Sequence, residues 1–276
     1  MTARPRVLRP TPRRPRRARL IVAFFALVFL LPVLFRFAAE WLWFQALGYE
    51  RVFATQLVAR ALLGLGVGAA AFAFLYGNIR IGLRGAFLNP RLAQITPAGP
   101  VDLTQLVRRM ALPAALGAAV LLGLGAASAW LDVLRFAHQT PFGTTDPVFG
   151  RDVAYYVFSV PVIAGAIRLL TILTTVTLTA TVFLYVLRRD VAAFGRHVTV
   201  EPPARLHVAV LVATLFLLTA LRVQFVRLPG LLHSTTGPLV GASYADLHGT
   251  LVGLRLAAFA AVIGRASCRE RVFVGV

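Results

Sequence analysis

The chain has 276 residues, of which 58% are hydrophobic and 14% charged, and its mean hydropathy is +0.77. So many apolar residues exclude an ordinary water-soluble domain, whose core cannot absorb them. The net charge of +19 suggests nucleic acid, but all 29 basic residues are arginines and most lie in a terminal tail or beside apolar runs, which membrane threading explains better.

The first nineteen residues form a tail rich in arginine and proline. It holds eight arginines, and four prolines interrupt it, so it can neither fold helically nor bury apolar surface. We expect residues 1–19 to be disordered, cytoplasmic and attracted to anionic lipid headgroups, since each arginine near such a leaflet contributes about 1 kcal/mol. Nucleic acid is not an expected partner, because the tail lacks interleaved aromatic residues for base stacking.

Apolar runs follow the tail, and most are near the roughly 20 residues that cross a bilayer as a helix. Five are full predicted spans: residues 20–39, 57–76, 110–131, 169–187 and 206–221. A sixth, residues 251–263, is only a partial span. Because lipid cannot satisfy exposed backbone N–H and C=O groups, each span must be a helix. The predicted fold class is an all-α, polytopic transmembrane helix bundle over residues 20–263, truncated within its sixth span.

Arginines are unevenly shared between alternate loops. The tail and the second and fourth loops hold seventeen, whereas the first, third and fifth loops hold five. Because cytoplasmic loops retain excess positive charge, the N-terminus is predicted to be cytoplasmic and the chain to be a multi-pass protein of the cell membrane. Trp41, Trp43, Phe44 and Tyr49 follow the first span and are typical of an aromatic belt at the membrane interface.

Small and polar residues within the spans predict how the helices pack. Glycines recur in the second and third spans, which lets helix backbones approach closely: Gly64, Gly66, Gly68, Gly117, Gly123 and Gly125. The threonines of the fourth span are expected to bond the carbonyl one turn earlier. Arg60 lies one turn inside the second span, where anchoring by snorkelling is the expected role and a transport pathway the alternative.

The third and fifth loops carry the candidate site residues. Asp146 and Asp152 lie in the third loop, and Asp246 and His248 lie just before the sixth run. Together with His138, these side chains could gather around a divalent metal. The alternative is that Asp246 caps a helix and His248 is solvated. No catalytic or cofactor-binding residue is identified, and no cofactor is expected.

Three segments resemble a known family: Trp43–Phe53 with its Leu47-Gly48-Tyr49, the third-loop run Asp146-Pro147-Val148-Phe149-Gly150-Arg151-Asp152 that leads to Pro161, and Gly241–His248. In order and spacing they are similar to Uncharacterised Protein Family 0182, from about Trp41 to Leu256. The resemblance implies a bacterial integral membrane protein with about seven helices near its N-terminus, followed by a large extracytoplasmic region. It implies no reaction.

The last thirteen residues depart from this pattern. The string from Gly264 to Val272 turns abruptly polar and looks like the translation of a sequencing adapter, so residues 264–276 are expected to be non-native. The only cysteine, Cys268, lies within them and carries no redox inference.

Three functions from different classes remain open on these grounds. The first is a membrane-embedded scaffold that anchors an extracytoplasmic domain missing from this fragment. The second is a transporter or channel, although no predicted span carries a mid-membrane Asp, Glu, Lys or His. The third is a membrane enzyme with an outer-face site, for which no catalytic signature is found. Protein partners are not indicated.

Overall fold

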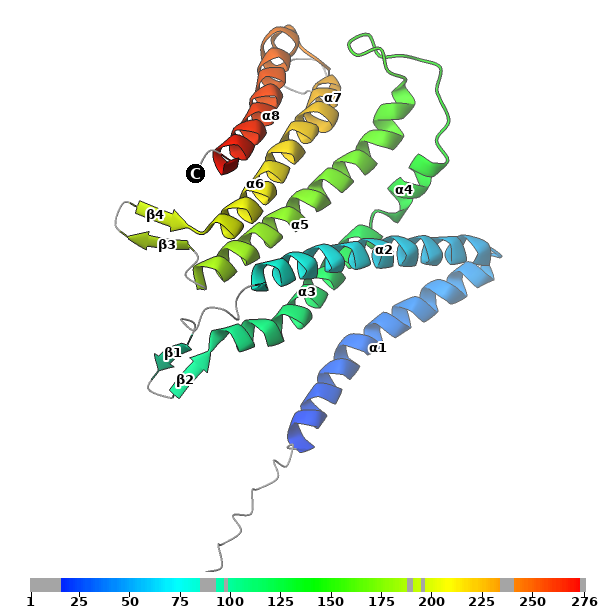
Figure 1. The fold of residues 1–276 in the computed structure, drawn as a ribbon. Coiled ribbons are helices and arrows are strands. Elements are labelled where there is room, and N and C mark those ends of the chain that lie inside the picture. The colour runs from blue at the N-terminus through cyan, green and yellow to red at the C-terminus, as the bar shows by residue number, and fades with distance from the viewer. Residues whose placement is uncertain are drawn as a thin grey trace, which may run out of the picture. The chain divides into compact units, whose positions relative to one another are not determined.

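The computed structural model describes residues 16–84, 93–96, 99–187, 191–194, 197–233 and 241–273. The predicted tail comprises residues 1–19. Residues 1–15 lie outside this part of the chain, whereas residues 16–19 are helical, so the prediction that they are disordered is wrong. Helices dominate the described residues, as predicted (Figure 1). The chain divides into two compact units, Met1–Leu57 and Val58–Val276, which are treated separately below.

In the first unit, helix α1 (Arg16–Ala46) is joined by a tight turn to the start of α2 (Glu50–Leu83). Gly48 sits in that turn with a φ of 72°, a conformation that glycine adopts without strain. Helix α1 begins four residues before the predicted span, because Pro15 is the last proline of the tail and a helix can start directly after one; a further proline, Pro32, lies inside α1.

Aromatic rings hold the two helices of this unit together. Phe53 of α2 is buried, and the rings of Phe37, Trp41 and Phe44 lie 5.4–5.6 Å from it. Trp41, which is 39% exposed, and Phe44 therefore contact Phe53 across the two helices, whereas Trp43 and Tyr49 are each 59% exposed. The sequence pattern alone does not show which of these rings contact Phe53 and which point away from it.

The second unit continues α2 and adds the remaining helices and two antiparallel hairpins. In chain order these elements are β1 (Ala93–Thr96), β2 (Gly99–Asp102), α3 (Leu103–Ala127), α4 (Trp130–Ala137), α5 (Val160–Leu187), β3 (Val191–Phe194), β4 (His197–Val200), α6 (Pro202–Arg222), α7 (Leu228–Gly230) and α8 (Leu251–Phe273). In β1–β2 the paired residues run from Ala93↔Asp102 to Thr96↔Gly99, and in β3–β4 from Val191↔Val200 to Phe194↔His197. The sequence predicts only loops at these places.

Successive long helices of the second unit run in alternate directions, so the unit has two ends (Figure 1). The hairpin end carries both β-hairpins, the ends of α2 and α5 and the starts of α3 and α6. The loop end carries α4, residues 138–154, α7 and residues 241–250. The predicted site residues lie at the loop end.

Five helical segments within the described residues are long and apolar enough to cross a membrane: Ala23–Ala46, Glu50–Leu83, Val107–Ala127, Tyr155–Leu187 and Pro202–His233. They match the five predicted runs in number and order, but several are longer than predicted. The apolar run of a span ends where polar residues begin, whereas its helix continues through such residues until the backbone turns. Helix α8 likewise continues past the apolar run 251–263, as far as Phe273.

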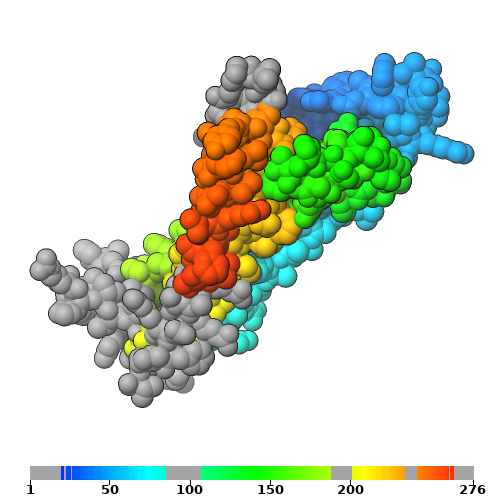
Figure 2. All heavy atoms as spheres, turned by 90° about the horizontal axis from the view of Figure 1, so that it is seen from above, coloured from blue at the N-terminus to red at the C-terminus, as the bar shows by residue number. Residues whose placement is uncertain are grey.

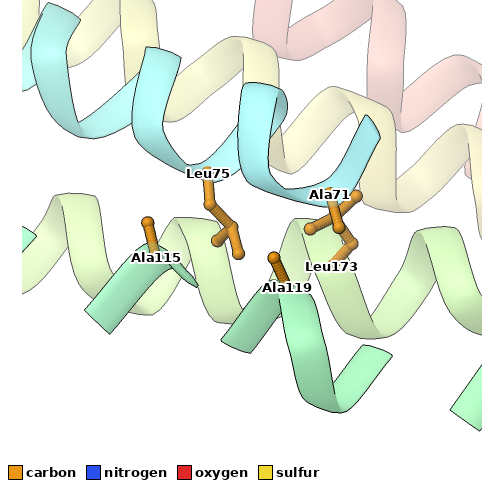
Figure 3. Close-up of a cluster of buried hydrophobic side chains, with 5 residues drawn as sticks. All are labelled: Ala71, Leu75, Ala115, Ala119 and Leu173. Atoms are coloured by element: carbon orange, nitrogen blue, oxygen red, sulfur yellow. The ribbon is translucent and has the colours of Figure 1, made fainter. Parts of the chain in front are cut away.

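The core of the second unit is small and lies where three helices meet. Ala71 and Leu75 of α2, Ala115 and Ala119 of α3, and Leu173 of α5 form one buried cluster (Figure 3). Three of the five are alanines, which allows the helix axes to come close. Around this core the helix surfaces are apolar, and Leu65 and Leu121 are 74% and 72% exposed. In water so large an apolar surface would be unfavourable, whereas in hydrocarbon it carries no such cost.

Helices α2 and α3 cross at glycines, as the sequence predicts. A Cβ built on Gly123 would lie 2.5 Å from the carbonyl oxygen of Gly64, and one built on Gly68 would lie 3.4 Å from the carbonyl oxygen of Ala119. Gly66, Gly117 and Gly125 face open space, so only part of the predicted glycine set makes the contact.

Helix α8 packs along α6 over much of its length, and α8 lies on the face seen in Figure 2.

Five of the six threonines of the fourth predicted span bond their own helix, as predicted: the hydroxyls of Thr171, Thr175, Thr177, Thr179 and Thr181 each donate to the carbonyl four residues earlier, and the sixth is Thr174. These hydroxyl protons are thereby used within α5.

Candidate functional site

Asp146 organises the 138–154 loop, which joins α4 to α5. One carboxylate oxygen accepts hydrogen bonds from the backbone N–H groups of Val148 (2.8 Å) and Phe149 (2.7 Å). The other accepts from the backbone N–H of Arg151 (3.0 Å) and from the hydroxyl of Tyr156 (2.5 Å). A single side chain thus closes the turn and ties it to the start of the α5 segment.

Asp152 joins the beginning and the end of the same loop through its hydrogen bonds. It accepts hydrogen bonds from the backbone N–H groups of Phe142 (3.1 Å), Gly143 (2.9 Å) and Ala154 (2.7 Å). Gly143 and Gly150 have φ angles of 74° and 65°, the left-handed conformation that such tight turns require. Both carboxylates therefore serve as acceptors for the backbone of their own loop.

The hydrogen bonds lower the pKa of both groups. Partial burial raises the pKa of Asp146, but the bonds from the Tyr156 hydroxyl and from three backbone N–H groups outweigh it, so that the pKa lies below the usual 3.8. The backbone N–H groups of Ala154 and Phe142 lower the pKa of Asp152 in the same way. Both groups are anionic near neutral pH and cannot act as general acids there.

Further contacts attach the loop to the helices of its own unit. The hydroxyl of Ser159 donates to the side-chain oxygen of Gln139 (3.0 Å), and Ser159 is buried. The Arg151 guanidinium lies 4.3 Å from the centre of the Tyr155 ring, a cation–π contact. The loop therefore has a fixed shape although much of it is exposed.

Asp246 and His248 lie in a π-helical turn, Asp246–Thr250, that leads into α8. The carboxylate of Asp246 is buried and accepts from the backbone N–H and the hydroxyl of Ser243 (3.1 and 2.8 Å), while the backbone N–H of Asp246 lies 3.2 Å from the Ser243 hydroxyl oxygen. Ser243 is thus the N-cap residue, and Asp246 is its partner in a reciprocal capping box. His248 is exposed, and its ring stacks on Tyr244 at 4.0 Å. These contacts match the capping alternative.

The structure does not gather the proposed metal ligands into a group. Among the residues it describes, no three His, Cys, Asp or Glu side chains lie close enough to hold a metal ion. His138, the fifth residue of the proposed set, is exposed and has its Nδ1 atom 3.0 Å from the carbonyl oxygen of Leu134. The carboxylates of the 138–154 loop shape the backbone of the loop end.

A polar cluster at the hairpin end is missing from the sequence prediction. His207 of α6 has its Nδ1 atom 2.8 Å from the hydroxyl of Tyr185 of α5 and its Nε2 atom 2.8 Å from Oδ1 of Asn78 of α2. His207 falls within the predicted span 206–221, and a histidine there is the one signal of this cluster. Its contact with Asn78 joins residues 129 positions apart, which spacing along the chain does not reveal.

Arg60 makes a contact between two helices. Its guanidinium lies 5.3 Å from the centre of the Trp130 ring, at the start of α4. This cation–π contact joins α2 to α4, and the predicted snorkelling of Arg60 stays a prediction.

The comparisons with known proteins identify a family without an assigned activity. A model of an uncharacterised protein family, UPF0182, matches residues 18–274. The chain is 31% identical over 245 residues to a UPF0182 protein of Trichlorobacter lovleyi, covering 87% of this chain and 27% of that protein. It is 34% identical over 237 residues to one of Cupriavidus necator, covering 80% and 25%.

A UPF0182 protein of Mycobacterium marinum is 31% identical over 284 residues, with 98% of this chain and 28% of that protein covered. No solved structure matches. The chain spans about a quarter of the length of the curated relatives it matches. The family match covers nearly all of these 276 residues, so the chain belongs to the uncharacterised protein family UPF0182.

Proposed function

We propose that this chain is the membrane-embedded scaffold of a larger bacterial cell-membrane protein, with its N-terminus in the cytoplasm, and that its loop end holds an extracytoplasmic domain. The observation that carries the proposal is the 138–154 loop, which is exposed yet held in one shape by Asp146 and Asp152. Ordering an exposed loop costs conformational entropy, and a preordered surface reduces that cost when a partner binds.

Two further observations support the scaffold. The curated relatives are more than three times as long as this chain, which leaves room for a large domain beyond the helices. The arginine asymmetry assigns the loop end to the outside and the arginine-rich tail to the cytoplasmic leaflet, where it attracts anionic headgroups.

The alternatives make different demands on the residues. A transporter needs a polar path, yet the threonine hydroxyls of α5 donate to their own helix. An outer-face enzyme needs an acid and base or a metal, yet Asp146 and Asp152 accept bonds from their own loop. These contacts favour the scaffold over the transporter and the enzyme.

Site-specific photocrosslinking in the complete gene product tests the scaffold. A photoreactive phenylalanine analogue replaces Phe142, which is 52% exposed at the loop end. We expect it to crosslink to the protein's own region beyond α8, detected as a linked pair of peptides by mass spectrometry.

Leu116, which is 54% exposed on α3, is the matched control position, because its surface faces lipid in the scaffold. The analogue there is expected to crosslink to lipid and not to that later region. Lipid adducts alone at position 142 would contradict the scaffold. Substrate flux by the purified complete protein in liposomes would favour the transporter instead.

A further inference from the structure

Arg255 is a charged residue in the middle of the apolar stretch of α8. It lies nine positions after Asp246, where the helical segment begins at the loop end, and is therefore roughly 14 Å along the helix. That distance is about half of the roughly 30 Å thickness of the hydrocarbon core of a bilayer. Because α8 packs along α6, which belongs to a segment able to cross a membrane, Arg255 lies at membrane depth.

Arg255 has no charged partner among the residues that the structure describes. Its side chain is exposed, and within the described part of the chain it makes no hydrogen bond, ion pair or ring contact. The α8 residues three and four positions away are all apolar: Leu251, Val252, Ala258 and Phe259. A charge that faces hydrocarbon is unfavourable, and arginines at such depth nearly always face protein or another charge.

Helix α6, the neighbour of α8, does not supply the missing partner. Between residues 202 and 222 it contains no aspartate or glutamate. Its threonine hydroxyls at Thr214 and Thr219 donate to carbonyl groups of α6 itself, at 2.8 Å in each case. The partner of Arg255 must therefore come from elsewhere.

The side of α8 that carries Arg255 is not covered within the described part of the second unit. Leu251, Leu254 and Ala258 are partly buried, as expected of the side packed on α6. Val252, Leu256, Phe259 and Ile263 are 48–65% exposed, and their spacing of three and four residues places them on one stripe of the helix. Figure 2 shows α8 at the surface of the molecule. We call Val252, Arg255, Leu256, Phe259 and Ile263 the open face of α8.

The direction of α8 determines on which side of the membrane the chain continues. Helix α8 begins at the loop end and runs back beside α6 towards the hairpin end (Figure 1). In the proposed orientation the chain therefore leaves α8 on the cytoplasmic side, whereas the proposed domain lies outside. A chain that leaves on the inside must cross the membrane again to reach that domain. The curated relatives are more than three times as long as this chain, which leaves room for such a crossing.

We propose that the next membrane-spanning helix of the complete gene product packs on the open face of α8 and places an aspartate or glutamate carboxylate beside Arg255. The inference rests on the proposed function, from which it takes the side of the membrane where the outer domain lies. A guanidinium offers five N–H donors in a planar fork, which a carboxylate accepts with both of its oxygens. The next helix runs antiparallel to α8, and the regular spacing of the exposed apolar residues allows it to pack along α8.

Photocrosslinking from the open face identifies what covers it in the complete protein in its own membrane. A photoreactive phenylalanine analogue replaces Phe259, which is 65% exposed. We expect a crosslink to an apolar segment that follows α8, detected as linked peptides by mass spectrometry. The same analogue at Phe183 of α5, which is 63% exposed, is the matched control and is expected to give lipid adducts without that link.

Lipid adducts alone at position 259 would overturn the proposal, and so would a link to α1 or to a second copy of the chain. The result at position 142 separates this inference from the proposed function. A link from position 142 without one from position 259 would overturn only the covering helix. A link from position 259 without one from position 142 would overturn only the docking of the outer domain at the loop end.

Replacing Arg255 with leucine gives a second test, because lipid and a carboxylate predict opposite changes in the thermal unfolding midpoint. If the guanidinium faces lipid, leucine removes an unfavourable charge and raises the midpoint. If a carboxylate lies beside it, leucine leaves that carboxylate buried without a partner. We expect a lower midpoint for Arg255→Leu and a smaller loss for Arg255→Lys, which keeps the charge. A midpoint for Arg255→Leu at or above that of the parent would overturn the proposal. Crosslinking at position 259 keeps Arg255 and decides the matter even where Arg255→Leu does not fold.

Discussion

Replacing Gly123 with alanine is expected to lower the stability of the bundle by about 1–3 kcal/mol, the usual cost of overpacking a close contact. The new Cβ would lie 2.5 Å from the carbonyl oxygen of Gly64 and 3.3 Å from Cα of Gly68. Both obstacles are backbone atoms of α2, which cannot rotate away as a flexible side chain can. Helices α2 and α3 must therefore separate, and the core at Ala71, Ala115 and Ala119 must loosen with them.

Thermal unfolding of the detergent-purified protein, followed by the loss of monodisperse protein, measures this effect. Gly125→Ala is the matched control, because Gly125 lies on the same helix and nothing lies within 4 Å of its added Cβ. Both substitutions gain the same helix propensity, about 1 kcal/mol, so their difference isolates the crossing. Gly64→Ala, with contacts at 3.2 Å, is expected to fall between them. Equal midpoints for Gly123→Ala and Gly125→Ala would show that this crossing does not form.

Replacing Asp146 with alanine is expected to open the 138–154 loop while the helices persist. The substitution removes the acceptor of three backbone N–H groups and one hydroxyl. Hydrogen bonds to a charged group contribute roughly 1.5–3 kcal/mol each, less where water can replace them. With about 2 kcal/mol lost from the closed loop, its open fraction rises roughly 30-fold. Limited proteolysis of the loop, timed against the parent protein, measures this change.

Asp132→Ala is the control, since Asp132 makes only a 4.0 Å ion pair with exposed Arg135 and such pairs contribute little.

Acidification offers an independent check of the role of the two carboxylates in the loop. The pKa of Asp146 and of Asp152 is lowered on folding, so the loop is stabilised above the unfolded pKa and loses this stabilisation as the pH falls below about 3.9 towards the folded pKa. Cleavage should be constant from pH 7 to 5 and should rise only at more acidic pH. A resistant Asp146→Ala loop would contradict this account of its shape.

The number and order of the long helices could be predicted from the sequence because each depends on a local property, an unbroken apolar run. Their lengths could not, since α5 follows a π-helical turn that begins at Tyr155, well before the apolar run at residue 169. The glycines that allow close approach were identified, but choosing Gly123 over Gly125 requires knowing which side of α3 faces α2. The two hairpins depend on chain pairing within polar loops, where hydropathy gives no signal.

The candidate site shows the same division between local and distant contacts. From the sequence, Asp146 is a candidate metal ligand, whereas in the structure its carboxylate bonds its own backbone. The turn residues Pro147 and Gly150 close behind it are the local signal that could have indicated this role. A shared metal site would have required Asp246 and His248 to meet that loop, a tertiary contact for which spacing carries no information. The cluster of Asn78, Tyr185 and His207 is missing from the prediction for the same reason, since it joins side chains from three separate helices.

Thiol labelling with a membrane-impermeant maleimide tests most directly whether the two ends of the second unit face opposite sides of a membrane. With the native cysteines replaced, a single cysteine is placed at Thr145 of the loop end or at Glu201 of the hairpin end, both exposed positions. In intact cells the cysteine at 145 should be labelled, and the cysteine at 201 only after the membrane is permeabilised. Labelling at 201 from outside would contradict the orientation, and equal labelling of both in protein released by carbonate washing would contradict the membrane bundle itself.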